Sequence, residues 1–181
     1  MKEGMEKKIL VVVDMQNDFI DGALGSEYAN TVVLPNVVEK VKQAKADGEC
    51  ILFTCDTHFK RDYNEFVEGK TIPMHCEFNT HGWQINEKIV KANGASPLLV
   101  WKGTFGKVNW GEYIDHLIDN ETEIEICGLC TDICVVSNAL ILRALYPFNK
   151  ITVLADCCGG TSKEAHDAAL TVMKSCLINV V

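Results

Sequence analysis

The amino-acid sequence predicts an α/β fold of three layers, in which a six-stranded, mostly parallel sheet lies between two layers of helices. The first observation is a series of short apolar runs, rich in β-branched residues, of the kind that form strands buried on both faces. The second is that segments with apolar residues at helical spacing separate these runs. Right-handed crossovers between such strands produce an open parallel sheet with helices on both faces. Because no linker or repeat interrupts the pattern, we expect residues 1–181 to form one domain.

The first half of the chain contains two predicted strands and one predicted helix. Residues 8–13 are a continuous apolar run that predicts the first buried strand. Apolar residues at helical spacing between 34 and 44, with a proline near the start and Gly48 just past the end, predict the first helix. Residues 51–54 predict the second strand. The stretch from residue 58 to about 91 is irregular, polar and aromatic, and its length indicates a functional role.

The second half of the chain alternates regularly between strands and helices. Apolar runs predict the remaining strands, at residues 98–101, 123–127, 151–155 and 177–181. Residues 110–118 and 132–145 predict helices between them. Thr161-Ser-Lys-Glu164 matches a capping box that would begin the last helix. We expect that helix to bury one stripe of residues, namely Ala165, Ala168, Ala169, Val172, Met173 and Cys176.

Composition and charge limit the classes of function. A formal net charge of −8 argues against nucleic acid or an anionic membrane surface as a partner. We find no apolar run long enough to span a bilayer, and the charged start of the chain leads straight into a strand rather than resembling a signal peptide. Nine cysteines without an export signal predict reduced thiols and a cytoplasmic location. The apolar helix at 132–145 fits burial within one domain and a homo-oligomer interface equally well.

Chemically active side chains follow the predicted strands at their carboxyl ends. Five residues lie at or just past such an end, and they are Asp14, Asp56, Lys102, Cys130 and Asp156. The carboxyl ends of parallel strands share one edge of the sheet, which is where ligands bind in this fold class. Cys134 lies slightly further on, near the start of a predicted helix, where unpaired N–H groups and the helix dipole favour a thiolate. The sequence therefore predicts an active site at this edge.

Three of these residues predict a cysteine hydrolase. A Cys134 thiolate would attack a carbonyl carbon, while Asp14 would take the thiol proton and later pass it to the leaving group. Lys102 would hold the Asp14 carboxylate and the Cys134 thiol in position relative to each other. The N–H groups of Cys130 and Cys134 would bind the oxyanion, and water would hydrolyse the resulting thioester. Each residue alone has an ordinary structural explanation, but their coincidence at strand ends favours catalysis.

Three segments resemble the signature motifs of the isochorismatase-like cysteine hydrolases, which include the nicotinamidases. The segments are Asp14-Met-Gln-Asn-Asp-Phe19, Lys102-Gly-Thr-Phe-Gly and Gly128-Leu-Cys-Thr-Asp-Ile-Cys134-Val. The similarity spans nearly the whole chain in the family's order. It implies the isochorismatase-like (Rossmann-like) fold, an Asp14, Lys102 and Cys134 triad, and a cis peptide between Leu129 and Cys130 that shapes the oxyanion hole. Cysteine rather than glycine at position 134 resembles the amide-cleaving branch, so the resemblance implies hydrolysis of a small amide, with nicotinamide as the leading example.

The resemblance also implies a metal site, although it implies no organic cofactor. Nicotinamidases resemble this chain in an Asp-x-His pair and a later Pro-x-His-Cys segment, here Asp56, His58 and His75, which hold a divalent ion. Such ligands suit Zn²⁺, Mn²⁺ or Fe²⁺. The family's intermediate histidine has no counterpart between residues 59 and 72, where Glu68 or Glu65 could supply a carboxylate instead. The alternative is that Asp56 caps a turn and that both histidines make ordinary polar contacts.

Two departures from the family pattern bear on the substrate. Ile72 stands where nicotinamidases tend to carry an aromatic residue that stacks on the pyridine ring, and Asn79-Thr80 replaces their usual Gly-Thr. The candidate pocket walls in this chain are the aromatic residues Phe19, Trp83 and Trp110.

Two other functions remain open at this level. One is the hydrolysis of another small substrate, such as an N-carbamoyl or ureido compound. The other is a thiol-based redox or binding protein, because several further cysteines lie near the predicted site, at positions 127, 130, 157 and 158.

Overall fold

Six parallel strands form a single sheet in this computed structural model, which describes residues 7–181. The strand order is β3-β2-β1-β4-β5-β6, and each neighbouring pair is parallel. The strands are β1 (Lys8–Val13), β2 (Cys50–Asp56), β3 (Leu98–Lys102), β4 (Glu123–Leu129), β5 (Ile151–Gly159) and β6 (Asn179–Val180). After β3 the chain returns to the middle of the sheet and continues on the other side of β1. The sheet therefore changes its direction of winding between β1 and β4, where ligands bind in folds of this class.

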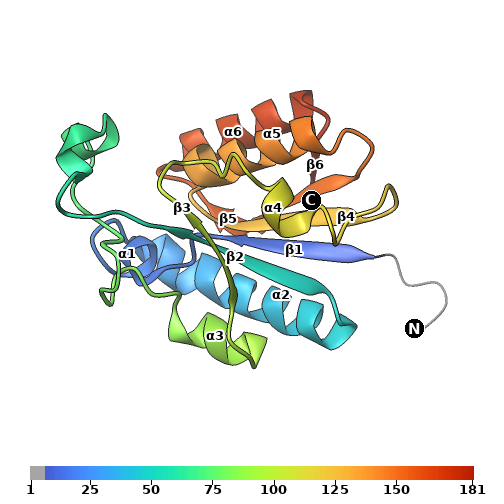
Figure 1. Ribbon diagram of the computed structural model, residues 1–181, viewed down its shortest axis with the longest axis horizontal. Helices are drawn as coiled ribbons and strands as arrows, with labels where there is room; N and C mark the ends of the chain where they lie inside the picture. Colours follow the sequence, from blue (N-terminus) through green and yellow to red (C-terminus); the bar gives the residue numbers. More distant parts are fainter. Residues whose placement is uncertain (1–6) are drawn as a thin grey trace.

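Helices cover both faces of the sheet and complete the predicted three layers (Figure 1). One face carries α2 (Leu34–Asp47) and α3 (Glu87–Asn93), and the other carries α5 (Val136–Leu145) and α6 (Lys163–Ser175). The shorter helices are α1 (Asn17–Ile20) and α4 (Gly111–Ile114), with 3₁₀ turns at η2 (Tyr63–Glu65) and η3 (Glu68–Lys70). Two π-helical turns, η1 (Ala29–Val33) and η4 (Thr131–Val135), lead directly into α2 and α5. None of the helices in the described part of the chain is long and apolar enough to cross a membrane.

The hydrophobic core lies on both faces of the central strands. Residues 9–13 of β1 are at most 1% exposed, which agrees with the continuous apolar run in the sequence. The helix α2 buries Val37, Val41 and Ala44 against the sheet, and it ends at Gly48, whose φ of 74° is the left-handed conformation expected of a helix C-cap.

Strands β4 and β5 extend beyond their predicted ends because of an irregularity between them. Their register shifts between Ile126 and Gly128, so that Ile126 pairs with Val153 whereas Gly128 pairs with Cys158. The extra residues of β5 form a bulge, after which the strand resumes pairing and continues to Gly159. Asp156 lies in this bulge and is exposed, so the prediction that it stands at a strand end is wrong.

The last helix begins one residue later than predicted and buries a different stripe. The side chain of Ser162, not that of Thr161, caps α6 by accepting a hydrogen bond from the Ala165 N–H at 3.1 Å. Of the six residues in the predicted stripe, only Ala169 and Met173 are buried, whereas Ala168, Val172 and Cys176 are exposed. The helix is rotated because it packs against η4 and α5 as well as against the sheet.

Candidate active site

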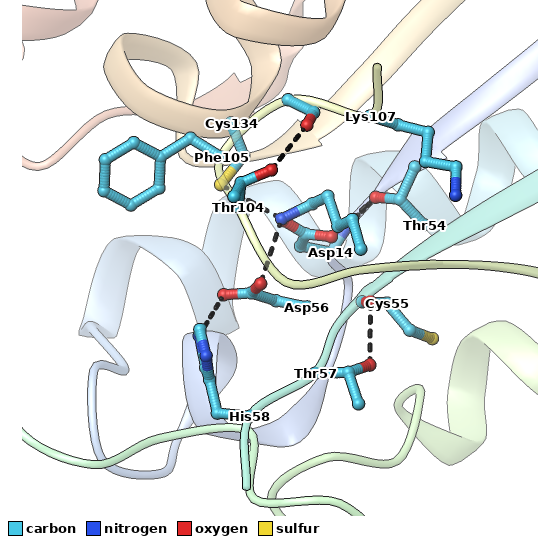
Figure 2. A network of polar contacts seen from close by, with 12 residues as sticks. Asp14, Thr54, Cys55, Asp56, Thr57, His58, Thr104, Phe105, Lys107 and Cys134 are labelled. Atoms are coloured by element: carbon cyan, nitrogen blue, oxygen red, sulfur yellow. Dashed lines mark hydrogen bonds and ion pairs between the residues drawn. The ribbon is translucent and has the colours of Figure 1, made fainter. Parts of the chain in front are cut away.

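Asp14, Lys102 and Cys134 meet at the carboxyl edge of the sheet. Asp14 follows β1, Lys102 is the last residue of β3, and Cys134 lies in η4, directly after β4. The Lys102 Nζ lies 2.6 Å from Asp14 Oδ2 and donates to the Cys134 Sγ at 3.5 Å. Figure 2 shows that Asp14, Asp56 and Cys134 converge on the same space. All three predicted triad residues are at most 4% exposed, so their contacts are shielded from solvent.

Lys102 also contacts Asp56, the last residue of β2. These two residues are register partners, and the Lys102 Nζ lies 3.3 Å from Asp56 Oδ1. Because β2 lies between β3 and β1 in the sheet, the lysine side chain passes the end of β2 before it reaches Asp14. One buried cation therefore faces two carboxylates and a thiol.

Burial and charge together determine the protonation of these groups. Burial raises the pKa of Asp14, and the Asp56 charge raises it further, although Lys102 opposes both effects. Burial also raises the pKa of Cys134 well above its ordinary value, with the Asp14 charge adding to this effect. Burial disfavours the Lys102 cation, but Asp14, Cys134 and Asp56 hold the pKa of Lys102 well above its ordinary value. Burial and the Asp14 charge therefore oppose the thiolate of Cys134, whereas the Lys102 cation favours it.

A cavity of about 430 Å³ lies beside Cys134. Around the sulfur its walls include Phe19, Phe105 and Ile133, and it reaches Asp56 and His75 as well. Figure 2 shows Phe105 close to Cys134 on the side away from Asp14. Cys134 therefore stands at the wall of a space large enough for a small organic molecule, with Lys102 and Asp14 behind it.

Two of the three aromatic residues predicted as pocket walls lie elsewhere. Trp110 is completely buried, and its indole N–H donates to the Asn138 Oδ1 at 3.1 Å. Trp83 donates its indole N–H to the Thr57 Oγ1 at 3.0 Å and packs edge-on against Trp101, outside this cavity. Of the three predicted aromatic residues, only Phe19 lines the cavity. The predictions for both tryptophans are wrong because the sequence shows that a residue is aromatic but not which way its ring points.

Four predicted metal ligands come together next to the triad. Asp56, His58, Glu68 and His75 each offer one ligand atom, and these atoms lie within 4.8 Å of one another. The Asp56 Oδ2 is 3.1 Å from the His58 Nε2 and 3.3 Å from the His75 Nε2. The Glu68 Oε1 lies 3.5 Å from the same nitrogen of His75. Glu65, the other carboxylate considered from the sequence, is exposed and does not belong to this group.

The chemistry of these four residues fits a divalent cation. The Glu68 Oε1 is buried and, among the described residues, accepts no hydrogen bond. A buried carboxylate oxygen without a donor is unfavourable unless a cation compensates it. The His75 Nδ1 lies 2.9 Å from the Pro73 carbonyl oxygen, which can accept the ring N–H and leave the Nε2 lone pair facing the group. Two imidazoles and two carboxylates form a donor set that suits zinc, manganese or iron.

Residues 8–181 match the family model described as the isochorismatase domain. The chain belongs to the isochorismatase family. It is 28% identical to a nicotinamidase of Escherichia coli over 199 residues, which cover 94% of this chain and 91% of that relative. It resembles the solved nicotinamidase/pyrazinamidase of Bacillus subtilis with a TM-score of 0.84 and 24% identity, over 97% of this chain and 99% of that one. It also resembles the pyrazinamidase of Pyrococcus horikoshii in complex with zinc, with a TM-score of 0.77 and 28% identity, over 97% and 98% of the two chains.

The turn before the nucleophile has the backbone that the isochorismatase family resemblance implies. The peptide bond between Leu129 and Cys130 is cis. Cys130 is the N-cap residue of η4, so that Cys134 lies in the first turn of this helical segment. N–H groups in the first turn of a helix lack intrahelical partners, which is the property an oxyanion hole requires.

Thr54 and Gln16 support this isochorismatase site, and our sequence analysis did not single out either of them. The Thr54 Oγ1 accepts a hydrogen bond from the Asp14 N–H at 3.0 Å and donates to Asp14 Oδ1 at 2.5 Å. The Gln16 side chain accepts from the Asp56 N–H at 2.7 Å and donates to the Asp56 carbonyl at 2.9 Å. Both residues are completely buried. One signal in the sequence could have identified them. Each is a polar residue at or near the end of a buried strand, where its side chain must find a hydrogen-bond partner within the protein.

Proposed function

We propose that this protein is a cysteine-dependent amidohydrolase that cleaves the carbon–nitrogen bond of a small amide to an acid and ammonia, as a nicotinamidase does. The observation that carries the proposal is the position of Lys102, which contacts both Asp14 and Cys134, while Cys134 lines a cavity. The similarity to the nicotinamidase of Escherichia coli along nearly the whole chain supports the same reaction class.

The first half of the reaction forms a thioester. When the amide carbonyl carbon lies against the Cys134 sulfur, Asp14 takes the thiol proton as the sulfur–carbon bond forms. The raised pKa of Asp14 suits this role, because a base with a higher pKa accepts the proton more readily. The N–H groups of Cys130 and Cys134 bind the oxyanion. Asp14 then gives its proton to the nitrogen as the carbon–nitrogen bond breaks, and ammonia leaves.

The second half of the reaction hydrolyses the thioester. Asp14 takes a proton from a water molecule, whose oxygen attacks the same carbonyl carbon. Collapse of the second tetrahedral intermediate breaks the sulfur–carbon bond, and Cys134 recovers the proton from Asp14 while the acid product departs. Throughout, the positive charge of Lys102 compensates the negative charge that moves between Asp14 and the sulfur.

Asp56, His58, Glu68 and His75 would hold a divalent ion, for which we propose zinc, manganese or iron. The zinc complex of the related pyrazinamidase of Pyrococcus horikoshii supports this assignment. Such an ion supplies Lewis acidity that polarises or orients a bound group. Asp56 links the two parts of the site, because its Oδ1 faces Lys102 and its Oδ2 faces both histidines.

The test is the release of ammonia from nicotinamide and a panel of other amides, with and without a chelator. We expect wild-type protein to release ammonia and Cys134→Ala to lower kcat by about 10³-fold or more while the protein stays folded. Cys176→Ala is the matched control, because Cys176 is exposed and lies outside the site. Retained activity in Cys134→Ala would show that the mechanism is wrong.

The same experiment separates the alternative functions. Ammonia release only from N-carbamoyl or ureido compounds would retain the triad and change the substrate. A redox or binding protein would release none, and would instead form a reversible disulfide between two of its cysteines, all nine of which are free in the structure. In the hydrolase, iodoacetamide should label Cys134 ahead of the other thiols because Asp14 can take its proton as the sulfur attacks, and Asp14→Asn should change that rate.

We further propose that the enzyme works in the cytoplasm on a small molecule, without a nucleic-acid or membrane partner. The net charge of −8 and the nine free thiols support this setting. A homo-oligomer is compatible with the exposed apolar side chains of Leu145 and Phe148 at and beyond the end of α5.

A further inference from the structure

Asn138 in α5 joins the segment of the nucleophile to the segment that follows β3. Its side chain is completely buried. The Nδ2 donates to the Cys134 carbonyl oxygen at 2.8 Å and to the Phe105 carbonyl oxygen at 3.1 Å. The Oδ1 accepts from the Lys107 N–H at 2.9 Å and from the Trp110 indole N–H at 3.1 Å. An asparagine amide offers two donors and two acceptor sites, so its whole hydrogen-bonding capacity is used.

The four partners allow only one orientation of this amide. Carbonyl oxygens accept and N–H groups donate, so an amide turned the other way would lose all four bonds at once. Buried polar groups without partners are unfavourable, and a fully satisfied buried network therefore fixes the groups that it joins. Asn138 thus holds the main chain of residues 105–107 at a set distance from the main chain at Cys134.

Gly106 brings the same segment directly against the helix. A Cβ added to Gly106 would lie 2.5 Å from the Ile141 Cδ1 and 3.3 Å from the Ser137 Cβ, and both of these residues belong to α5. The backbone of residues 105–107 therefore rests on α5. Because η4 leads directly into α5, this anchor lies on the same helical segment as Cys134.

The anchored segment carries a wall of the cavity. Phe105 and Cys134 both line this space, and Phe105 is 37% exposed. Its ring lies close to Cys134 on the side away from Asp14 (Figure 2). A ring-sized substrate whose carbonyl carbon lies against the sulfur can therefore contact the Phe105 ring. A gap of about 1 Å already removes up to about half of a dispersion contact, so this contact depends on where the segment is held.

We infer that Asn138 is a positioning residue that sets the distance between the Phe105 wall and the Cys134 sulfur, and thereby favours a substrate that contacts the ring. Asn138 does not itself line the cavity, so it acts through its partners. The inference rests on the proposed amidohydrolase function and names a residue that determines selectivity at the same site.

Two substitutions break this connection to different degrees. Asn138→Ala removes all four bonds. Asn138→Thr keeps a side chain of similar volume, and its hydroxyl can donate to the carbonyl four residues back, as the Ser137 Oγ does to the Ile133 carbonyl at 2.6 Å. A single hydroxyl cannot also serve the other three partners. The threonine variant should therefore keep the helix and release residues 105–107.

Asn149→Ala is the matched control. Asn149 is also buried, and its Nδ2 donates to two carbonyl oxygens, those of Asp119 at 2.6 Å and Thr122 at 2.9 Å. It lies just before β5, at the edge of the sheet opposite to Cys134. Its loss should lower stability as the loss of Asn138 does, without displacing a wall of the cavity.

The first measurement is the selectivity between two amides, at a temperature where circular dichroism shows the variants to be folded. We expect the ratio of kcat/KM for nicotinamide to that for acetamide to fall at least about fivefold in Asn138→Ala and Asn138→Thr. In Asn149→Ala this ratio should not change. In a Phe105→Ala background, replacing Asn138 should not lower the ratio further, because the wall that it positions is absent.

Alkylation of Cys134 provides a second measurement that does not depend on turnover. Iodoacetamide and its N-phenyl analogue, iodoacetanilide, carry the same reactive group, but only the second has a ring that can contact Phe105. The rate of the aromatic reagent relative to that of iodoacetamide should fall at least about threefold in Asn138→Thr and in Phe105→Ala, because both lose this contact. It should stay at the wild-type value in Asn149→Ala.

The outcomes separate the two proposals. Unchanged ratios in Asn138→Thr, or equal falls in Asn138→Ala and Asn149→Ala, would overturn the positioning role and retain the amidohydrolase. Additive losses from Asn138→Ala and Phe105→Ala, or a wild-type enzyme that prefers acetamide to nicotinamide, would overturn it as well. If the wild type cleaves no amide, the proposed function is wrong, and the alkylation rates alone decide whether Asn138 positions the wall.

Discussion

Thr54 makes both of its side-chain hydrogen bonds to Asp14, as an acceptor from the N–H and as a donor to Oδ1. Asp14 has a φ of 47°, a left-handed conformation that is uncommon for residues other than glycine. The two bonds hold the residue in this conformation and leave Oδ2 directed at Lys102. We therefore regard Thr54 as a positioning residue for the proposed base.

Replacing Thr54 with valine keeps the shape of the side chain and removes both bonds. We expect Thr54→Val to lower kcat by about 10–100-fold with a smaller change in KM, because Asp14 loses its orientation rather than its contact with substrate. Steady-state kinetics and the rate of Cys134 alkylation would measure the effect. Thr54→Ser is the control, since it retains the hydroxyl and should recover most of the activity. If the serine and valine variants behaved alike, the hydroxyl would have no positioning role.

Glu68 provides a second prediction at the level of one residue. Its Oε1 is buried without a hydrogen-bond donor, and burial and the Asp56 charge both raise its pKa. Glu68→Gln should therefore weaken zinc or manganese binding by about tenfold or more, while the metal-free protein keeps its stability or gains some. The readouts are metal content after dialysis and the rise in Tm on adding metal. Glu65→Gln should bind metal as the wild type does, because Glu65 is exposed. Equal losses in both variants would argue against Glu68 as a ligand.

At the scale of elements, the close approach of β4 to β1 depends on Gly128. This residue has a φ of 120°, and a Cβ added to it would collide with the Val13 carbonyl oxygen on the neighbouring strand. We expect Gly128→Ala to lower the free energy of unfolding by more than about 4 kcal/mol or to prevent folding, because the obstacle is backbone that cannot rotate away. Gly48→Ala is the matched control. Gly48 also has a positive φ, but nothing lies within 4 Å of its added Cβ, so the loss should be about 1 kcal/mol. Urea unfolding would compare them, and similar losses would contradict the steric argument.

The sequence was sufficient to predict the elements that depend on local pattern. The β-branched run of β1 predicted its bounds, and the alternation of strands and helices predicted the parallel three-layer fold that the structure and the family match confirm. The convergence of strand ends also predicted that Asp14, Lys102 and Cys134 would lie together. Their catalytic roles remain a prediction.

Features that depend on neighbouring strands and side-chain direction could not be predicted. The bulge in β5 arises from a register shift against β4, which leaves no periodic signal in either strand. Trp83 and Trp110 are aromatic residues in suitable segments, but their rings point into other parts of the structure. Thr54 looks like an ordinary strand residue until its partner on the next strand is known.

At the scale of the whole molecule, the two edges of the sheet carry different groups of charges. The proposed active site occupies the carboxyl edge, whereas Glu123, Lys8 and Lys150 lie at the amino edge, where Lys8 and Glu123 are register partners. The Glu123 side chain is only 6% exposed. It accepts a hydrogen bond from the Thr152 hydroxyl at 2.6 Å and lies 3.0 Å from the Lys150 Nζ. A change in the charge of Glu123 can therefore alter the stability of the fold without altering the proposed active site.

The pKa of Glu123 makes the stability of the fold depend on pH. Burial raises this pKa, but the hydrogen bonds from Thr152 and Lys150 and the charge of Lys8 hold it below its ordinary value of 4.5. A carboxyl group with a lowered pKa in the folded state stabilises the protein fully above its ordinary pKa. That contribution is lost as the pH falls through the folded-state pKa.

Glu123→Gln should therefore reduce the free energy of unfolding at pH 7 by on the order of 1 kcal/mol. The difference from wild type should shrink as the pH falls below 4.5, because Glu123 of the unfolded wild type then binds a proton while the folded state still resists it. Urea unfolding at a series of pH values measures this change. Glu121→Gln is the control. Glu121 is exposed in the turn just before β4, so its substitution should cause no such difference. The kcat of Glu123→Gln should equal that of the wild type, since the substitution lies at the edge opposite Cys134. A difference that stays constant with pH would mean that Glu123 acts through packing rather than through its charge.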